Sequence, residues 1–241
     1  MTFQDFKFKE NLQKAIDEAG FKEPSPIQID AIPHILLGKD IVGQAHTGTG
    51  KTAAFGLPVL NQLTGKNAEA VVIVPTRELA MQVSDELFKF GKFLGINTAT
   101  VYGGQAYARQ LKLIETASVI VATPGRFLDL LKNGHIKIKP KFVILDEADE
   151  MLDMWFLDDI KEIFTYLPED RQTLLFSATM PVAIKNLAKT ILKEPEFVTI
   201  TKSDVTNKNI TQTFYVVDER ERDDALIRLF DYKNPKKSII F

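Results

Sequence analysis

The sequence predicts an α/β protein in which a parallel sheet is covered by helices on both faces. Seven short runs rich in apolar and β-branched residues alternate with helical patterns along most of the 241 residues, which is typical of right-handed strand-helix-strand crossovers. Most runs are continuously apolar, as expected for strands buried on both faces. A glycine-rich loop ending in Lys51 and Thr52 lies between the first run and a helical pattern, and this context predicts a phosphate-binding loop.

The predicted elements follow one another in chain order. An amphipathic helix over residues 8–20 comes first, with Gly20 near its C-terminus. The predicted strands cover residues 40–43, 70–74, 98–102, 118–123, 142–146, 173–179 and 197–200. Helical patterns lie between them, among them residues 52–63, 77–94, 125–133 and 181–192. Together these elements define one predicted domain over residues 1–200.

The composition changes after residue 200. Residues 201–209 are polar and lack periodicity, so they predict a linker. A strand over residues 210–217 and a helix over 219–233 are expected next, and a further apolar run begins at Lys237. Because a buried strand does not normally stop after its first residues, we expect residues 210–241 to be the truncated beginning of a second α/β unit.

The overall composition narrows the classes of function. The net charge of −2 and the pI near 6.0 do not indicate a general polyanion-binding protein, so any nucleic-acid site must be a local patch. The absence of cysteine excludes disulfides, thiolate zinc sites and a cysteine nucleophile. The first residues lack the apolar core of a signal peptide, and no apolar run reaches the length of a membrane helix. We therefore expect a soluble, cytoplasmic protein.

The glycine-rich loop predicts binding of a nucleoside triphosphate. Gly48 and Gly50 allow backbone conformations that direct successive N–H groups inward, and the following helix adds its positive end. Lys51 supplies a charge to the β- and γ-phosphates, and the Thr52 hydroxyl is a Mg²⁺ ligand. Ala45 replaces the usual first glycine, which requires a negative φ there. The predicted nucleotide-binding loop comprises Ala45, His46, Thr47, Gly48, Thr49, Gly50, Lys51 and Thr52.

A carboxylate pair follows the apolar strand over residues 142–146. Asp146 leaves the end of this strand at the same sheet edge as the phosphate-binding loop, and there it is expected to bind Mg²⁺. Glu147 comes next and is placed to orient or deprotonate an attacking water. The alternative is an ordinary acidic helix start. With Lys51, these two residues form the predicted catalytic set.

Seven motifs together resemble the DEAD-box RNA helicases. GFKEPSPIQ, AHTGTGKT, PTRELA, GG, TPGR, DEAD and SAT occur in the order and spacing of that family, from about Phe3 to the end of the chain. VYGGQ and FSATMP look most like the bacterial cold-shock subgroup. The resemblance implies a two-lobed ATPase that uses ATP and Mg²⁺ to bind and unwind RNA, with both lobes RecA-like. This chain resembles the first lobe and the opening of the second.

The resemblance also implies which residues recognise the base of the nucleotide. Residues 1–36 would form an adenine-recognition extension. The Gln28 amide can donate and accept at once, which suits the adenine edge. Phe21 could stack on the base, or it could be a core aromatic. Phe3 matches a family aromatic, although packing explains it equally well.

Three turns at the carboxyl edge of the sheet predict a track for the RNA backbone. The first and third turns each follow an apolar strand and begin a helix. The second turn is a glycine pair, which permits close approach of the RNA to the protein backbone. Contacts to sugar and phosphate should be nearly independent of sequence. Helix capping is the alternative for the threonines. The residues are Pro75, Thr76, Arg77, Gly103, Gly104, Thr123, Pro124, Gly125 and Arg126.

Residues Ser177, Ala178 and Thr179 end a predicted strand and are well placed to hydrogen-bond Asp149. The resemblance implies that this contact couples ATP hydrolysis to unwinding, whereas helix capping is again the alternative. We expect His46 to face solvent. Trp155 replaces a common glycine and must be either buried by a local rearrangement or exposed at a contact surface.

The remaining histidines, His34 and His135, have no convincing partners and are expected to be structural. No arginine is placed to act as a finger on the γ-phosphate, and the family supplies one from the second lobe. This chain alone should therefore be nearly inactive. Two other functions fit the phosphate-binding loop: an NTPase acting on another substrate such as DNA, and a non-catalytic nucleotide-binding scaffold.

Overall fold

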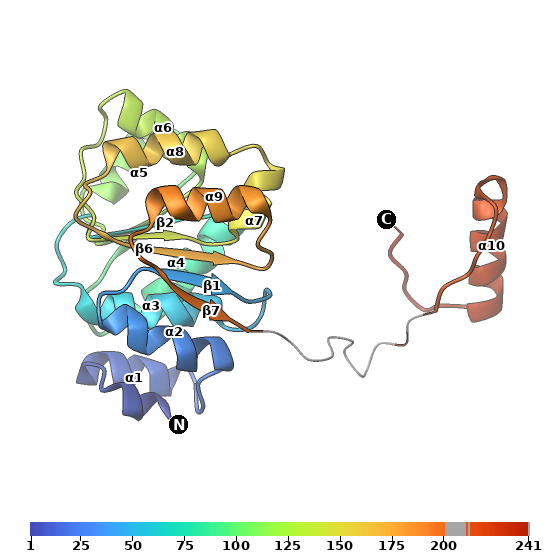
Figure 1. Ribbon diagram of the computed structural model, residues 1–241, viewed down its shortest axis with the longest axis horizontal. Coiled ribbons are helices and arrows are strands. Elements are labelled where there is room, and N and C mark those ends of the chain that lie inside the picture. The colour runs from blue at the N-terminus through green and yellow to red at the C-terminus, as the bar shows by residue number, and fades with distance from the viewer. Residues whose placement is uncertain (201–210, 212, 241) are drawn as a thin grey trace. The chain divides into compact units, whose positions relative to one another are not determined.

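The computed structural model describes residues 1–200, 211 and 213–240 (Figure 1). The chain divides into two compact units, unit 1 over Met1–Thr201 and unit 2 over Lys202–Phe241. Each unit is described by itself.

All seven predicted strands form, and they build one parallel sheet in unit 1. The strands are β1 (Ile41–Gln44), β2 (Ala70–Ile73), β3 (Thr98–Val101), β4 (Val119–Ala122), β5 (Phe142–Leu145), β6 (Gln172–Ser177) and β7 (Glu196–Thr199). Their order is β3-β4-β2-β5-β6-β1-β7, and every neighbouring pair is parallel. The parallel sheet predicted from the apolar runs is thus confirmed.

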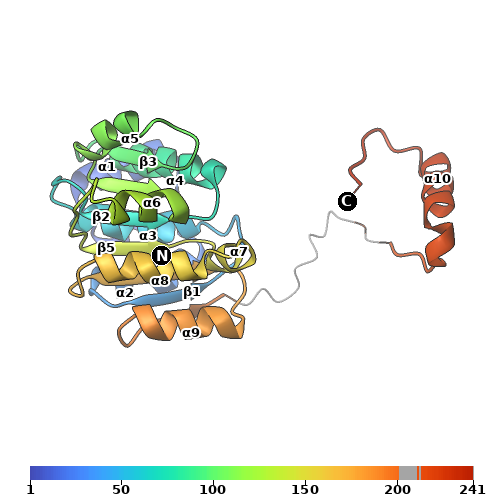
Figure 2. The ribbon, with the colours of Figure 1, turned by 90° about the horizontal axis from the view of Figure 1, so that it is seen from above.

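Helices cover both faces of this sheet, as Figures 1 and 2 show. One face packs against α2 (Pro26–Leu36), α3 (Lys51–Gln62) and α4 (Arg77–Gly91), with η1 (Phe3–Phe6) and α1 (Glu10–Glu18) beyond them. The other face packs against α5 (Tyr107–Ile114), α6 (Pro124–Lys132), α7 (Ala148–Asp153), α8 (Leu157–Tyr166) and α9 (Val182–Ile191).

Each central strand contributes to both cores because successive side chains point to opposite faces. In β2, Val72 lies in the core under α3 and α4, whereas Val71 and Ile73 lie in the core under the second helix layer. All residues of β2 are therefore buried, and the continuous apolar run follows from that. At the sheet edge, β7 buries Val198 and leaves Phe197 exposed.

Unit 2 departs from the prediction. Its described residues form η2 (Glu219–Glu221) and α10 (Arg222–Lys233), so the expected helix is present. The expected strand over 210–217 is wrong for residues 211 and 213–217, and residues 238–240 are not a strand either. A strand needs a partner for its ladder hydrogen bonds, and the described part of unit 2 contains no second strand. The predicted linker, residues 201–209, lies outside the described residues.

Candidate functional site

The phosphate-binding loop lies at the carboxyl end of β1, which pairs with β6 on one side and β7 on the other. Gly48 and Gly50 have φ values of +80° and +88°, which only glycine adopts readily. Ala45 does not have a positive φ, so the condition for replacing a glycine there is met. It is 1% exposed, and its N–H donates to the Ser177 carbonyl at 3.0 Å. This contact fixes the start of the loop.

Lys51 is the buried cation at the centre of the site. Its ammonium lies 2.8 Å from Glu147 Oε2 and 4.0 Å from Asp146 Oδ1, and its side chain is 4% exposed. This contact with Glu147 is an ion pair, and an ammonium has three N–H groups, so donors remain for a further ligand. A buried ammonium with unused donors is suited to an anionic ligand.

The two carboxylates meet Lys51 from the end of β5. Burial raises the pKa of Asp146 to about 7, Lys51 opposes this shift, and the nearby Glu147 charge adds to it. The Glu147 N–H donates to Asp146 Oδ1 at 3.0 Å, and Thr47 Oγ1 donates to Glu147 Oε1 at 3.0 Å. Glu147 has a φ of +54°, which is costly for a residue with a side chain and recurs at functional sites.

Thr52 stands in the first turn of α3, next to a carboxyl group that the sequence analysis did not identify. Glu86, on α4, lies close enough to Thr52 for its hydroxyl to act on the Glu86 carboxyl. Burial raises the pKa of Glu86, and the contact with Thr52 partly offsets this effect. No local sequence motif identifies Glu86, because only the packing of α4 against α3 brings it close to Thr52.

Gln28 is linked to the phosphate-binding loop rather than free. It is 2% exposed, its Oε1 accepts from the Ser25 N–H at 2.9 Å, and its Nε2 donates to the Gly50 carbonyl at 3.0 Å. One donor and one lone pair remain for a base. Phe21 packs edge-on against Phe3 and Phe90 with ring centroids 5.9 and 5.6 Å apart. Core packing therefore accounts for much of this half-buried ring.

The first two turns of the predicted RNA track lie together. Pro75 and Thr76 follow β2, and the Thr76 side chain accepts from the Leu79 N–H at 3.2 Å, so this threonine caps α4. Arg77 is exposed and lies over the glycine turn, because a Cβ on Gly104 would be 3.0 Å from its Nη1. Gly104 has a φ of +89°. An arginine over an open glycine turn suits an approaching phosphate.

The third turn is organised by Arg126. Its Nη1 donates to the Gln105 carbonyl at 2.9 Å and to Gln110 Oε1 at 3.0 Å, and its guanidinium stacks 4.3 Å from the centre of the Tyr107 ring. Gln110 is fully buried and also donates to the Tyr102 carbonyl at 2.7 Å. Gln110 was not among the predicted site residues, although a glutamine on the apolar side of a short helix is a usable signal.

Thr123 begins α6, whose first helical residue is Pro124, and Gly125 follows in the same turn. Unlike Thr76, Thr123 makes no side-chain cap hydrogen bond. Capping therefore explains the first threonine of the track but not the second.

Asp149 connects the carboxylate segment with the end of β6. Its N–H donates to Ser177 Oγ at 3.1 Å, and its Oδ2 accepts from both the N–H and the hydroxyl of Thr179 at 2.8 Å. The Ala178 N–H makes a longer contact of 3.4 Å with Oδ1. Burial would raise the pKa of Asp149, but these hydrogen bonds lower it. The predicted hydrogen bonds between Asp149 and the end of β6 are thus present.

Other singled-out residues lie apart from the site. His46 is exposed, as predicted. Trp155 is 91% exposed with a φ of +63°, so the exposed alternative holds. The described residues contain no group of three or more histidines and carboxylates that could hold a metal. None of the described helices has both the length and the apolar character needed to span a membrane.

Comparisons with known proteins agree with one another. The family model for DEAD/DEAH box helicases matches residues 25–187. Over its whole length the chain is 56% identical to the DEAD-box ATP-dependent RNA helicase RhpA of Helicobacter pylori and 46% identical to CshA of Bacillus subtilis, covering 49% and 50% of those proteins. It thus spans about half the length of these curated relatives. A crystal structure of a DEAD box protein from Methanococcus jannaschii superposes with a TM-score of 0.81 at 41% identity, over 95% of this chain and 63% of that one.

Proposed function

The chain belongs to the DEAD/DEAH box helicase family, and on this premise we propose that it is the ATP-binding lobe of an ATP-dependent RNA helicase. The observation that carries the proposal is the buried group of Lys51, Asp146 and Glu147 at the phosphate-binding loop. The arginine-bearing turns that suit a nucleic-acid backbone lie at the same edge of the sheet. The RhpA and CshA relatives carry the same activity in their names.

Lys51 is proposed to change partners when ATP binds. Its ammonium leaves Glu147 for the β- and γ-phosphates, and the inward N–H groups of the loop hold the same phosphates. Thr52 and Asp146 would hold Mg²⁺; they fit because such a site uses one or two protein oxygens and completes its shell with phosphates and waters. Bound Mg²⁺ would neutralise charge on the phosphates.

Glu147 is proposed to act on the attacking water. Once Lys51 binds phosphate, the Glu147 carboxylate is no longer neutralised and can accept a proton from the water. Thr47 holds one of its oxygens at 3.0 Å, and this contact orients the other. The Gln28 contact with Gly50 would make the loop sensitive to the base bound beside it.

The RNA strand is proposed to follow the turns that carry Arg77, Gly104 and Arg126. Guanidinium and backbone N–H groups bind phosphates without reading bases. The two hydrogen bonds between Thr179 and Asp149 would couple a change at the bound nucleotide to the conformation of this RNA surface. We also infer a cytoplasmic location.

A second lobe is inferred to complete the enzyme, since the chain spans half of its relatives. Residues 210–241 would begin that lobe. None of the four arginines of unit 1 is placed as a finger. Arg77 and Arg126 lie at the RNA edge, and Arg109 is exposed on α5 beside the edge strand β3. Arg171, just before β6, lies 4.7 Å from the centre of the Phe164 ring. Such a finger is worth about 10³–10⁵ in rate.

The test is steady-state ATP turnover with RNA, with DNA and without nucleic acid. Residues 1–241 would be compared with a protein that continues through a second lobe. We expect RNA-stimulated turnover only in the longer protein, and ATP binding without appreciable turnover in residues 1–241. Stimulation by DNA alone would favour another NTPase, and ATP binding without turnover in both proteins would favour a scaffold. Robust RNA-stimulated turnover by residues 1–241 would contradict the assignment of the finger to a second lobe.

A further inference from the structure

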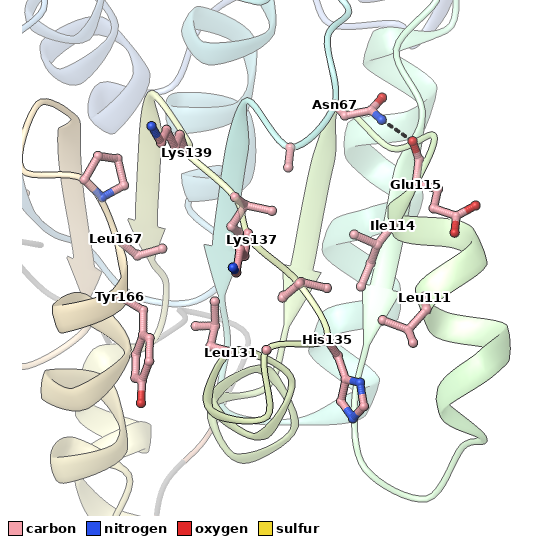
Figure 3. Close-up of a pocket in the computed structure, with 15 residues that line it drawn as sticks. Asn67, Leu111, Ile114, Glu115, Leu131, His135, Lys137, Lys139, Tyr166 and Leu167 are labelled. Atoms are coloured by element: carbon pink, nitrogen blue, oxygen red, sulfur yellow. Dashed lines mark hydrogen bonds between the residues drawn. The ribbon is translucent and has the colours of Figure 1, made fainter.

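A cavity of about 970 Å³ lies in unit 1 at the end of the sheet opposite the phosphate-binding loop. Its lining includes residues just before β2, β5 and β6, so it opens at the amino ends of the strands. Leu111 and Ile114 of α5 form one wall, Leu131 of α6 forms the floor, and Leu167 lies opposite (Figure 3). None of these residues belongs to the proposed ATP or RNA surfaces.

An extended segment, the 134–140 strap, crosses this cavity. It begins at Gly134, which has a φ of +66°, and its side chains alternate. Ile136 is buried and Ile138 half-buried against the core, whereas His135, Lys137 and Lys139 are exposed. Figure 3 shows the strap running between Leu167 on one side and Ile114 on the other. This alternation is that of a β-strand with one face on the core.

None of the described strands pairs with the strap. Within the described residues, the backbone N–H groups of Lys137, Ile138 and Lys139 donate to no protein acceptor. A short extended segment with unused backbone groups is a template for pairing with another strand. The cavity beside it offers apolar room for alternate side chains of such a strand.

The charges along the strap are unbalanced. Neither Lys137 nor Lys139 forms an ion pair with a described carboxylate. The acidic residue in the lining, Glu115, lies on the α5 wall, at the C-terminal end of that helix. An occupant that runs along the strap would therefore meet two uncompensated positive charges.

We propose that this groove binds an extended acidic peptide segment of a partner protein. Its backbone would pair with the strap, and its apolar side chains would enter the cavity beside Leu111 and Leu167. Its carboxylates would face Lys137 and Lys139 from the solvent side. Backbone pairing gives affinity in such complexes, and the pockets for alternate side chains give specificity. This inference is independent of the proposed helicase function.

The experiment measures fluorescence anisotropy of a fluorescein-labelled peptide of seven residues in which Glu and Leu alternate, titrated with the full chain. A peptide with Lys in place of Glu is the charge control. Lys137→Glu with Lys139→Glu should weaken binding by about tenfold or more. The matched control, Lys185→Glu with Lys189→Glu, reverses two exposed lysines on α9 and should leave binding unchanged. Thermal unfolding would verify that both variants fold.

Backbone pairing is tested separately with two peptides methylated on alternate backbone nitrogens. In an extended peptide, alternate backbone N–H groups point to opposite sides, so only one of the two sets faces the strap. The peptide whose strap-facing N–H groups are methylated should therefore bind several-fold more weakly than the other. Equal binding of the Lys peptide, or binding that is unaffected by the change at Lys137 and Lys139, would overturn the proposal. So would loss of single-stranded RNA binding in that variant without loss of peptide binding, because the lysines would then serve a nucleic acid.

Discussion

Glu147→Gln should tighten the binding of ATP by this chain. Glu147 Oε2 lies 2.8 Å from Lys51 Nζ, and the two side chains are 6% and 4% exposed. An incoming γ-phosphate has to separate this pair and then remain close to the carboxylate charge. Glutamine keeps the shape of the side chain and can still accept the hydrogen bond from Thr47, but it removes that charge.

The magnitude follows from the charges that remain. Two unit charges 4 Å apart interact by about 4 kcal/mol at an effective dielectric constant of 20, which is an upper bound here. Asp146 lies 4.0 Å from Lys51. Its pKa is about 7 because of burial and, in part, because of Glu147, so removing the Glu147 charge lets Asp146 ionise and take over part of the pairing. We expect a net gain of about 1–2 kcal/mol, or about 5- to 30-fold in affinity.

The assay is a fluorescence titration of a labelled ATP with Mg²⁺ at pH 7 and low salt. ADP lacks the γ-phosphate, so the variant's affinity for ADP should increase less than its affinity for ATP. Thr47→Val is the matched control, since it removes the hydrogen bond to Glu147 and keeps the charge, and it should change ATP affinity less than twofold. Unchanged or weaker ATP binding by folded Glu147→Gln, or an equal gain for ADP, would refute the reasoning.

Three further predictions concern other parts of unit 1. Burial would raise the pKa of Glu69, but hydrogen bonds lower it to about 2, so its stabilisation is complete above its ordinary pKa of 4.5 and is lost as the pH falls towards 2. Glu69→Gln should therefore cost about 1–3 kcal/mol at pH 7 in urea unfolding, with solvent screening favouring the lower end; a difference that persists at pH 2 would contradict this. Gln110→Leu should weaken RNA binding in a filter assay about three- to tenfold, because Arg126 loses a buried acceptor at 3.0 Å; unchanged RNA binding by the folded variant would contradict this. Gln28→Ala should weaken ATP binding and leave GTP binding, which we expect to be weak in the unmutated chain, unchanged; equal losses of affinity for both nucleotides would mean that Gln28 acts only through Gly50.

The architecture of unit 1 was readable from the sequence because it depends on local patterns. A strand buried on both faces leaves a continuous apolar run, and all seven runs became strands of the parallel sheet. The phosphate-binding loop was readable for a similar reason, since glycines at positive φ and a lysine at a helix start are adjacent in the chain. The contact between Asp149 and Thr179 followed from two strands that end at the same edge.

Tertiary structure alone decided contacts between elements that are distant in the chain. Nothing local in the sequence pairs Lys51 with Glu147 or brings Glu86 close to Thr52, because these contacts depend on which strands and helices become neighbours. The buried role of Gln110 beneath Arg126 has the same origin.

The strap and the predicted strand over 210–217 both show that strands cannot be predicted from composition alone. The strap over 134–140 has a strand-like alternation of side chains, but no described strand pairs with it, and the backbone N–H groups of residues 137–139 donate to no acceptor in the described part of the chain. Residues 213–217 have a strand-like composition, yet they form no strand. Composition determines which segments favour an extended backbone. Hydrogen-bonded neighbours determine which of them become strands, and those neighbours are set by the fold as a whole.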